Sequence, residues 1–286
     1  MTAFENNRLV YDSELTQKQF LKLSGIISNE YGIKMPLSKK QLLQSRLYNR
    51  LLALEMKNFN EYFEFLFDHG VNESELIQLV DLVSTNKTGF FREMHHFEFI
   101  KGQILHETES GSFSNRLIKC WSAGCSSGEE PYSLSVTLQE IIEKNRSMDY
   151  KVMGTDISSR MINKAVQGIY KEEDTANIPY FQKKKYFLKS KDHSKNLVRL
   201  KPVIRNKNKF VRLNLMDERY PMMETFDYIL CRNVLIYFER EVQEEVIKKL
   251  SARLKKGGYF FLGHSESIIN MNVPLRQVRA TIFQRI

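Results

Sequence analysis

Apolar residues near the start of the chain recur at the spacing of amphipathic helices. From Ser13, one predicted helix carries Leu15, Phe20, Leu23, Ile26 and Ile27 on one face, and Gly32 is placed to end it. Similar patterns predict four further helices, over residues 38–54, around 62–67, after 72, and from 84 to 104. Five helices without a convincing strand predict a small all-α domain over residues 1–105.

The pattern changes after a polar stretch, residues 106–116, which we interpret as a linker. Apolar runs that predict strands then alternate with helices, at 117–123, 151–155, 209–213, 226–231 and 259–263. The helices between them begin at Glu130, at the cap Ser158 and near Arg240, and Gly257-Gly258 is placed to end the last one. This alternation predicts an α/β fold over residues 106–286, with a mostly parallel, doubly wound sheet. Two final runs, 275–279 and 281–285, lack an intervening helix and predict an antiparallel edge.

One basic segment interrupts the alternation, at about residues 180–208. It contains ten Lys or Arg residues, together with the alternating run Leu197–Lys201 and the pair Val203-Ile204. Alternation of this kind favours short strands, so we predict a small antiparallel β insertion with a basic exposed face.

Composition is that of an ordinary globular protein, with 42% hydrophobic and 27% charged residues in a chain of 286. No apolar stretch is long enough to cross a bilayer, and the polar N-terminus does not resemble a secretory signal. Three cysteines make no disulfide framework and lack the spacing of a zinc site. We therefore expect a cytoplasmic protein without a metal.

The net charge of +9, from 43 basic and 34 acidic residues, is compatible with nucleic acid, an anionic membrane or an acidic protein partner. One basic stripe, Lys39, Arg46 and Arg50, lies beside the apolar face of the second predicted helix. The stripe is either a solvated helix face or a docking surface.

Small residues follow the first predicted strand, in the run Trp121–Pro131 (WSAGCSSGEEP). A strand–turn–helix of small residues lets backbone N–H groups approach a ligand, although the spacing is neither a dinucleotide fingerprint nor a Walker A loop. Asp156 ends the next strand, where a carboxylate can accept both hydroxyls of a ribose. Each feature alone is also compatible with ordinary turn chemistry.

Polar or small residues also follow two later strands, as Asn214-Leu215 and as Cys231–Phe238 (CRNVLIYF). Ligands of doubly wound sheets bind outside the carboxyl ends of the strands, and Asn214 with Leu215 is suited to flank an adenine. Four such strand ends in order favour an adenosine-containing cofactor.

At this point the sequence resembles the CheR family, chemotaxis protein-glutamate O-methyltransferases that use S-adenosylmethionine. The resemblance rests on Thr85–Glu93 (TNKTGFFRE) with His95-His96-Phe97, on Trp121–Ser133, Thr155-Asp156-Ile157, Asn214-Leu215, Cys231–Phe238 and Gly263–Glu266 (GHSE). These motifs extend from about residue 80 to 270 in the expected order. The fold it implies is an N-terminal helical domain and a Rossmann-like class I methyltransferase domain with a β insertion.

The resemblance also implies site residues. Arg92 and Tyr237 would lie nearest the reacting centre, and the cofactor site would comprise Asn86, Thr88, Arg92, Gly124, Glu130, Asp156, Asn214, Leu215, Arg232 and Asn233. Either Glu130 or its neighbour Glu129 would hold the ammonium of the donor, and S-adenosylhomocysteine would be the product. The stripe Lys39, Arg46 and Arg50 would dock on the cytoplasmic helices of chemoreceptors, and the β insertion could capture a receptor's C-terminal peptide.

Other interpretations compete with these. A nucleic-acid methyltransferase would use the basic charge on phosphates, but the fourth strand end lacks the Asn/Asp-Pro-Pro-Tyr/Phe signature. A non-catalytic cofactor-binding scaffold would be expected to lack Arg92 or Asp156, and both are present. Adjacent helical positions such as His95 and His96 diverge by about 100°, so packing is favoured over metal binding. Cys125 is better explained as a small packing residue than as a nucleophile, and we expect a monomer.

Overall fold

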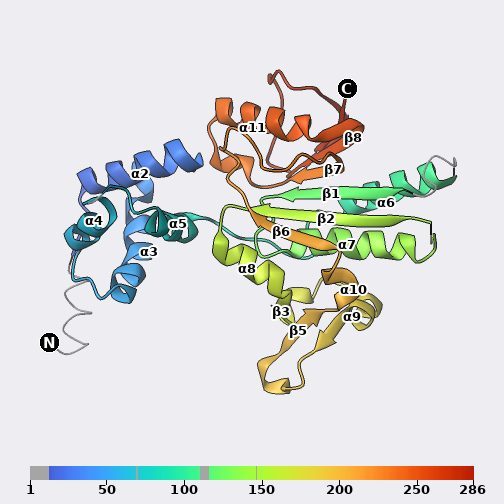
Figure 1. The fold of residues 1–286 in the computed structure, drawn as a ribbon, viewed down its shortest axis with the longest axis horizontal. Coiled ribbons are helices and arrows are strands. Elements are labelled where there is room, and N and C mark those ends of the chain that lie inside the picture. The colour runs from blue at the N-terminus through green and yellow to red at the C-terminus, as the bar shows by residue number, and fades with distance from the viewer. Residues whose placement is uncertain (1–12, 69, 110–115, 146) are drawn as a thin grey trace. The chain divides into compact units, whose positions relative to one another are not determined.

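A computed structural model describes residues 13–68, 70–109, 116–145 and 147–286. The chain divides into two compact units, one of residues 1–85 with 237–239 and one of residues 86–236 with 240–286 (Figure 1). Each unit buries its own hydrophobic cluster.

The first unit is all-α in its described part, as predicted. Its elements are α2 (Gln17–Tyr31), the 3-10 turn η1 (Leu37–Lys39), α3 (Lys40–Ala53), α4 (Phe59–Phe67) and α5 (Glu73–Val83). Thr16 begins α2 with a capping box, and Gly32, at φ +70°, ends it. The apolar faces of the helices meet in a core that includes Leu23, Leu47 and Tyr62.

The boundary between the units lies earlier than the predicted one near residue 106. Helix α6 (His95–Glu109) belongs to the second unit, because its buried Phe97, Ile100 and Ile104 join the core of that unit. The predicted helix start at residue 84 is also wrong, since Phe91 and Glu93 have φ values of +54° and +58° and the helix begins only after them. Of the predicted linker, residues 110–115 lie outside the described residues.

The second unit is built on a mixed sheet, which among the described residues has seven strands in the order β6-β2-β1-β7-β8-β10-β9. The strands are β1 (Leu117–Ala123), β2 (Asp149–Asp156), β6 (Asn208–Arg212), β7 (Phe226–Cys231), β8 (Leu254–Leu262), β9 (Leu275–Arg279) and β10 (Ile282–Arg285). The first five in spatial order are parallel, and β10 and β9 add the predicted antiparallel edge. Gly257 and Gly258 lie inside β8, so they do not end a helix as predicted.

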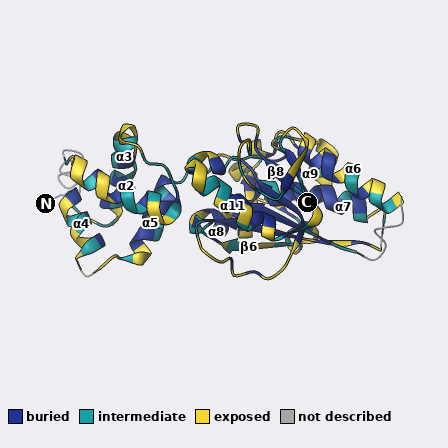
Figure 2. Cartoon of the chain, turned by 90° about the horizontal axis from the view of Figure 1, so that it is seen from above, coloured by how far each residue is buried: buried dark blue, intermediate teal, exposed yellow. Residues whose placement is uncertain are grey.

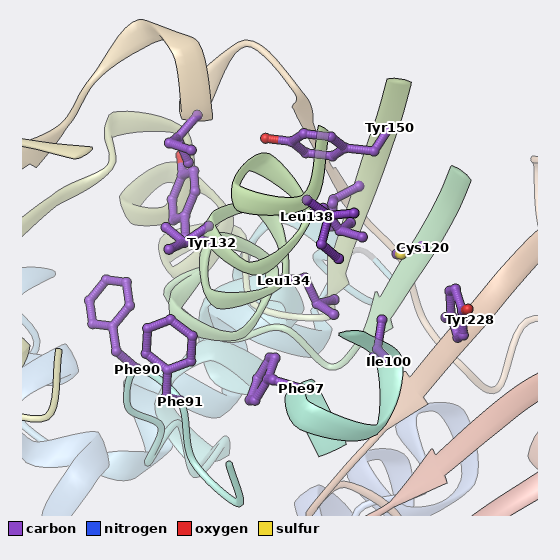
Figure 3. Packing of buried hydrophobic residues seen from close by; sticks show 14 of the residues in the cluster. Phe90, Phe91, Phe97, Ile100, Cys120, Tyr132, Leu134, Leu138, Tyr150 and Tyr228 are labelled. Carbon is purple, nitrogen blue, oxygen red and sulfur yellow. The ribbon is translucent and has the colours of Figure 1, made fainter. Parts of the chain in front are cut away.

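Helices α7 (Glu129–Ile142), α8 (Ser159–Gln167) and α11 (Arg240–Ala252) pack on this sheet, and the 3-10 turn η4 (Leu235–Tyr237) follows β7. Leu134 and Leu138 of α7 share one buried cluster with Cys120 of β1 and Tyr150 of β2 (Figure 3). Buried residues accordingly follow the strands and the inward helix faces, whereas exposed residues follow the outer faces (Figure 2). Parallel pairing of β6, β2, β1, β7 and β8 brings the carboxyl ends of these strands to one edge of the sheet.

The predicted insertion is a second, antiparallel sheet in the order β3-β5-β4, formed by β3 (Ile169–Lys171), β4 (Phe187–Lys189) and β5 (Leu197–Leu200). It also contains helices α9 (Tyr180–Tyr186) and α10 (Pro202–Arg205) and the 3-10 turns η2 (Glu173–Thr175) and η3 (His193–Lys195). The strand predicted at Val203-Ile204 is therefore wrong, because Pro202 begins a helical turn there.

Candidate functional site

The turn after β1 is shaped by residues with left-handed backbone. Gly124 and Gly128 have φ values of +84° and +97°, and Ser126 between them has +48°. A Cβ on Gly124 would lie 2.3 Å from Cγ2 of Val234, and one on Gly128 would lie 2.8 Å from Cβ of Ala165. Only glycine satisfies both requirements at positions 124 and 128, so the turn holds the start of α7 close to its neighbours.

Asp156 ends β2 and braces this turn. Its Oδ2 accepts a 2.8 Å hydrogen bond from the N–H of Ser126, and its Oδ1 accepts one of 2.9 Å from the N–H of Ser158. Ser158 in turn caps α8, as predicted, by accepting from the N–H of Met161. The buried carboxylate therefore lies between the ends of two parallel strands, where ligands of this fold class bind.

Arg232, directly after β7, joins two acidic side chains inside the unit. Its guanidinium Nη1 lies 3.1 Å from Oε2 of Glu130, and Nη2 lies 3.4 Å from Oε2 of Glu93. Nη2 also donates to the main-chain carbonyl of Arg92. The Arg232 side chain is 1% exposed, so its guanidinium is enclosed by these partners and has little surface for direct contact with a ligand.

The two candidates for the donor ammonium have different surroundings. Oε1 of Glu130 accepts a 2.6 Å hydrogen bond from the hydroxyl of Ser122, at the end of β1. Burial raises the pKa of the Glu130 carboxyl, whereas the charge of Arg232 opposes that shift. The Glu129 carboxylate instead accepts from the Ser127 hydroxyl at 2.8 and 2.9 Å. Only Glu130 therefore joins the charged groups at the ends of β1 and β7.

Glu266 holds the backbone near the site in place, a role that the sequence did not indicate. Its buried carboxylate accepts hydrogen bonds from four backbone N–H groups, those of Asn233, Val234, Leu235 and Gly263. Four donors to one carboxylate satisfy a buried anion without a paired cation. The motif Gly263–Glu266 could have drawn attention to this residue, but no local pattern connects position 266 with position 233.

Residues 86–92 reach the glycine-containing turn through main-chain contacts. The carbonyl of Asn86 accepts a 3.0 Å hydrogen bond from the Ser126 hydroxyl, and the N–H of Phe91 donates to Oγ of Ser133. Arg92 is exposed, and its Nη1 donates to the carbonyl of Lys87 at 3.1 Å. Thr88 lies half-buried in the same segment.

Asn214 and Leu215 follow β6, beside the end of β2. Oδ1 of Asn214 accepts from the N–H of Met216 at 3.0 Å, which shapes a tight turn. Leu215 is buried, and its carbonyl accepts hydrogen bonds from the Tyr220 hydroxyl and from Nζ of Lys249. The structure thus brings these two residues to the same edge of the sheet as Asp156.

Histidine and cysteine side chains are engaged in packing. His96 is fully buried, its Nε2 lies 2.8 Å from the Thr281 hydroxyl, and burial together with the charge of Arg232 lowers its pKa to about 2. The His95 ring stacks on His264 with centroids 5.0 Å apart. Burial raises the pKa of the Cys125 thiol, which makes it a poor nucleophile. Over the described ranges, no three His, Cys, Asp or Glu residues gather as a metal site would require.

The three residues of the basic stripe make hydrogen bonds or an ion pair within the first unit. Nζ of Lys39 donates to the carbonyl of Lys34, and Nη1 of Arg46 donates to the carbonyl of Leu82 at the end of α5. Arg50 pairs with Glu75 at 2.5 Å, and Glu75 is 2% exposed. Arg46 and Arg50 lie on α3, whereas Lys39 ends the turn η1 just before this helix, and Arg50 has a buried acidic partner.

Tyr237 ends η4 and is assigned to the first unit, where its carbonyl accepts a 2.9 Å hydrogen bond from the N–H of Lys34. Its role beside the reacting centre stays a prediction.

Comparison with known proteins decides the family. Residues 86–284 match the family described as "CheR methyltransferase, SAM binding domain", and residues 18–84 match "CheR methyltransferase, all-alpha domain". The chain belongs to the CheR methyltransferase family. The two matches meet at residues 84–86, in agreement with the division into compact units.

Curated relatives of this family align over most of the chain. The "Chemotaxis protein methyltransferase" of Borreliella burgdorferi is 39% identical over 265 residues, 92% of this chain and 92% of the relative. That of Escherichia coli is 32% identical over 90% of this chain and 87% of its own length. "Chemotaxis protein methyltransferase 2" of Pseudomonas aeruginosa is 33% identical, over 94% and 93%.

Family membership confirms the predicted fold class and the predicted activity. The chain is a methyltransferase. Along the sequence, an all-α domain precedes an S-adenosylmethionine-binding domain. None of its described helices combines the length and the apolar character that a bilayer crossing demands.

Proposed function

We propose that this enzyme transfers the methyl group of S-adenosylmethionine to glutamate side-chain carboxylates of methyl-accepting chemotaxis receptors, as a cytoplasmic monomer without a metal. The names of its relatives, which are chemotaxis protein methyltransferases, support the substrate class. The observation that carries the proposal is the convergence of the glycine-containing turn, Asp156, Glu130 and Arg232 at one edge of the parallel sheet.

The residues at this edge fit the donor. The carboxylate of Asp156 is suited to the ribose hydroxyls, and Leu215 with Asn214 is suited to the adenine. Of the two glutamates, Glu130 would hold the ammonium group, since only its carboxylate lies with Arg232 at the strand ends. Gly124, Asn86, Thr88 and Asn233 would complete the cleft.

Methyl transfer requires alignment of the donor methyl group with the receptor carboxylate more than it requires acid–base catalysis. Bound S-adenosylmethionine supplies a methyl group on a sulfonium cation. A receptor glutamate, with an ordinary pKa of about 4.3, is already ionised at neutral pH and needs no general base. Holding nucleophile and donor in line can supply up to ~7–11 kcal/mol. We expect the exposed guanidinium of Arg92 to orient the incoming carboxylate, and Tyr237 to contribute to the reacting centre.

Docking would use two surfaces. Lys39 and Arg46 of the first unit would meet acidic receptor helices, with a smaller contribution from Arg50 because Glu75 already neutralises it. In the insertion, β4 is an edge strand with exposed Leu188 and Lys189, beside the exposed aromatic Phe181 of α9. An apolar, acidic C-terminal peptide of a receptor could add to this edge as a strand.

The test is transfer of tritiated methyl from S-adenosylmethionine to chemoreceptor-containing membranes. Label released by base as methanol is the expected result, because methyl esters hydrolyse in base. Label on RNA or DNA alone would instead favour the nucleic-acid alternative.

Arg92→Lys should lower turnover at saturating donor. Arg276→Lys, on the distant edge strand β9, is the matched control. Near-normal turnover of Arg92→Lys would contradict the alignment role.

A further inference from the structure

The loop after β7 is held in place by one distant carboxylate. Oε2 of Glu266 accepts from the N–H groups of Asn233 and Gly263 at 2.8 and 2.7 Å. Oε1 accepts from Val234 and Leu235 at 2.9 and 2.8 Å. Both oxygens of the side chain are therefore committed to backbone donors, and three of the four donors are consecutive residues of one loop.

The same loop meets the donor site on its other side. The ideal Cβ position of Gly124 lies 2.3 Å from Cγ2 of Val234, so the loop presses against the turn after β1. The ideal Cβ position of Gly263 lies 2.3 Å from Nδ2 of Asn233, so the residue after β8 also packs against the loop without space for a side chain. A displacement of the loop would therefore move the walls of the cleft that the donor enters.

We propose that Glu266 is a positioning residue for the methyl donor, acting through residues 233–235 and not by contact with the donor. This inference rests on the proposed donor site at the ends of β1, β2 and β7. The carboxylate is buried and accepts without donating, so it is suited to gather consecutive N–H groups around a single point. It connects the ends of β7 and β8 and sets how the loop meets Gly124.

The chemistry of the side chain makes the proposal specific. A glutamine at position 266 keeps the shape but turns one oxygen into an NH2 group, which would face two N–H donors. An aspartate keeps the charge but is one methylene shorter, so it can restore only part of the four-fold contact. We expect the affinity for the donor to be highest in the wild type, lower in Glu266→Asp and lowest in Glu266→Gln.

The experiment measures the Kd of S-adenosylhomocysteine by calorimetry and the steady-state KM for S-adenosylmethionine on receptor membranes. Glu266→Gln should raise both by about tenfold or more, while kcat at saturating donor falls much less. Glu245→Gln, an exposed glutamate on α11, is the matched control and should bind like wild type. Far-UV circular dichroism verifies that each variant is folded.

Each outcome separates the possibilities. A folded Glu266→Gln that binds S-adenosylhomocysteine like wild type would overturn the positioning role, and so would equal losses of kcat and kcat/KM without a change in KM. If Glu266→Gln fails to fold, the same measurements on Glu266→Asp test the proposal. An unchanged KM for the donor in Glu266→Asp would then overturn it. Failure of the wild-type protein to bind S-adenosylhomocysteine would refute the donor site itself.

Discussion

Nη1 of Arg232 lies 3.1 Å from Oε2 of Glu130, and the arginine side chain is 1% exposed. The arginine comes from the end of β7 and the glutamate from the first turn of α7, two segments about a hundred residues apart in the chain. Because Nη2 of the same guanidinium also faces Glu93, one cation balances two acidic side chains. The site therefore depends on Arg232 for both its geometry and its charge balance.

Loss of this cation should be costly. Arg232→Met leaves Glu130 and Glu93 buried without a counter-charge, which should lower the free energy of unfolding by about 3–5 kcal/mol. Urea denaturation measures this change. Lys248→Met, which breaks a solvent-exposed pair with Glu244 on α11, is the control and should leave the free energy of unfolding nearly unchanged. Equal effects of the two substitutions would contradict the buried network.

Arg50 should behave as a structural residue of the first unit. Its partner Glu75 is 2% exposed and also accepts a 3.0 Å hydrogen bond from the Tyr62 hydroxyl. Arg50→Met should therefore destabilise the protein by about 1.5–3 kcal/mol, the range for hydrogen bonds to charged groups. Lys40→Met, which breaks a pair with the exposed Glu14, should cost less than ~1 kcal/mol in the same urea titration. An unchanged stability of Arg50→Met would contradict the structural role and leave Arg50 as a docking residue like Lys39 and Arg46.

Acidification should destabilise the protein through His96. Its pKa is about 2 in the folded protein, against 6.5 for an unperturbed histidine, so only the unfolded chain binds the proton between these values. The free energy of unfolding should thus fall by up to ~1.4 kcal/mol for each pH unit below 6.5 from this group alone. His96→Gln removes the titration and should flatten the dependence of stability on pH between 5 and 6.5. Parallel slopes for the two proteins would disprove the assignment.

Two glycines should respond oppositely to alanine. Gly124 has φ +84° and no space for a Cβ, so Gly124→Ala should cost about 1–3 kcal/mol and weaken S-adenosylhomocysteine binding. Gly102 lies inside helix α6 with nothing within 4 Å of its Cβ position, so Gly102→Ala should stabilise by up to ~1 kcal/mol. Thermal unfolding with and without the ligand measures both effects. A Gly124→Ala protein as stable and as competent to bind as wild type would argue against the tight turn.

Local sequence signals predicted the regular elements well. Strand β7 has the predicted bounds, Phe226–Cys231, because a short apolar run between turns has few alternatives. Gly32 and Ser158 end and begin helices as expected, since caps act through neighbouring residues. The start of α6 was mispredicted, because the left-handed turn at Phe91 and Glu93 arises in the packed fold and has no helical pattern of its own.

The site was less predictable where contacts are remote in sequence. Asp156 was proposed from its place at the end of a strand, which is a local property, whereas the role of Glu130 came from the family resemblance. The burial of Arg232 and the role of Glu266 depend on pairing across the sheet, which no spacing in the sequence reveals. Gly257 and Gly258 illustrate the same limit, since β8 continues past them through an irregularity at which its pairing with β7 shifts register.

The link from Glu266 back to Asn233 also has a consequence for biosynthesis. The side chain that anchors this loop lies beyond β8, about thirty residues after Leu235. The loop can therefore close only after β8 has been translated, and a product cut short ahead of position 266 would lack its anchor. Such a fragment would still contain the five parallel strands, so it could form a sheet whose loop after β7 is not fixed against the turn after β1.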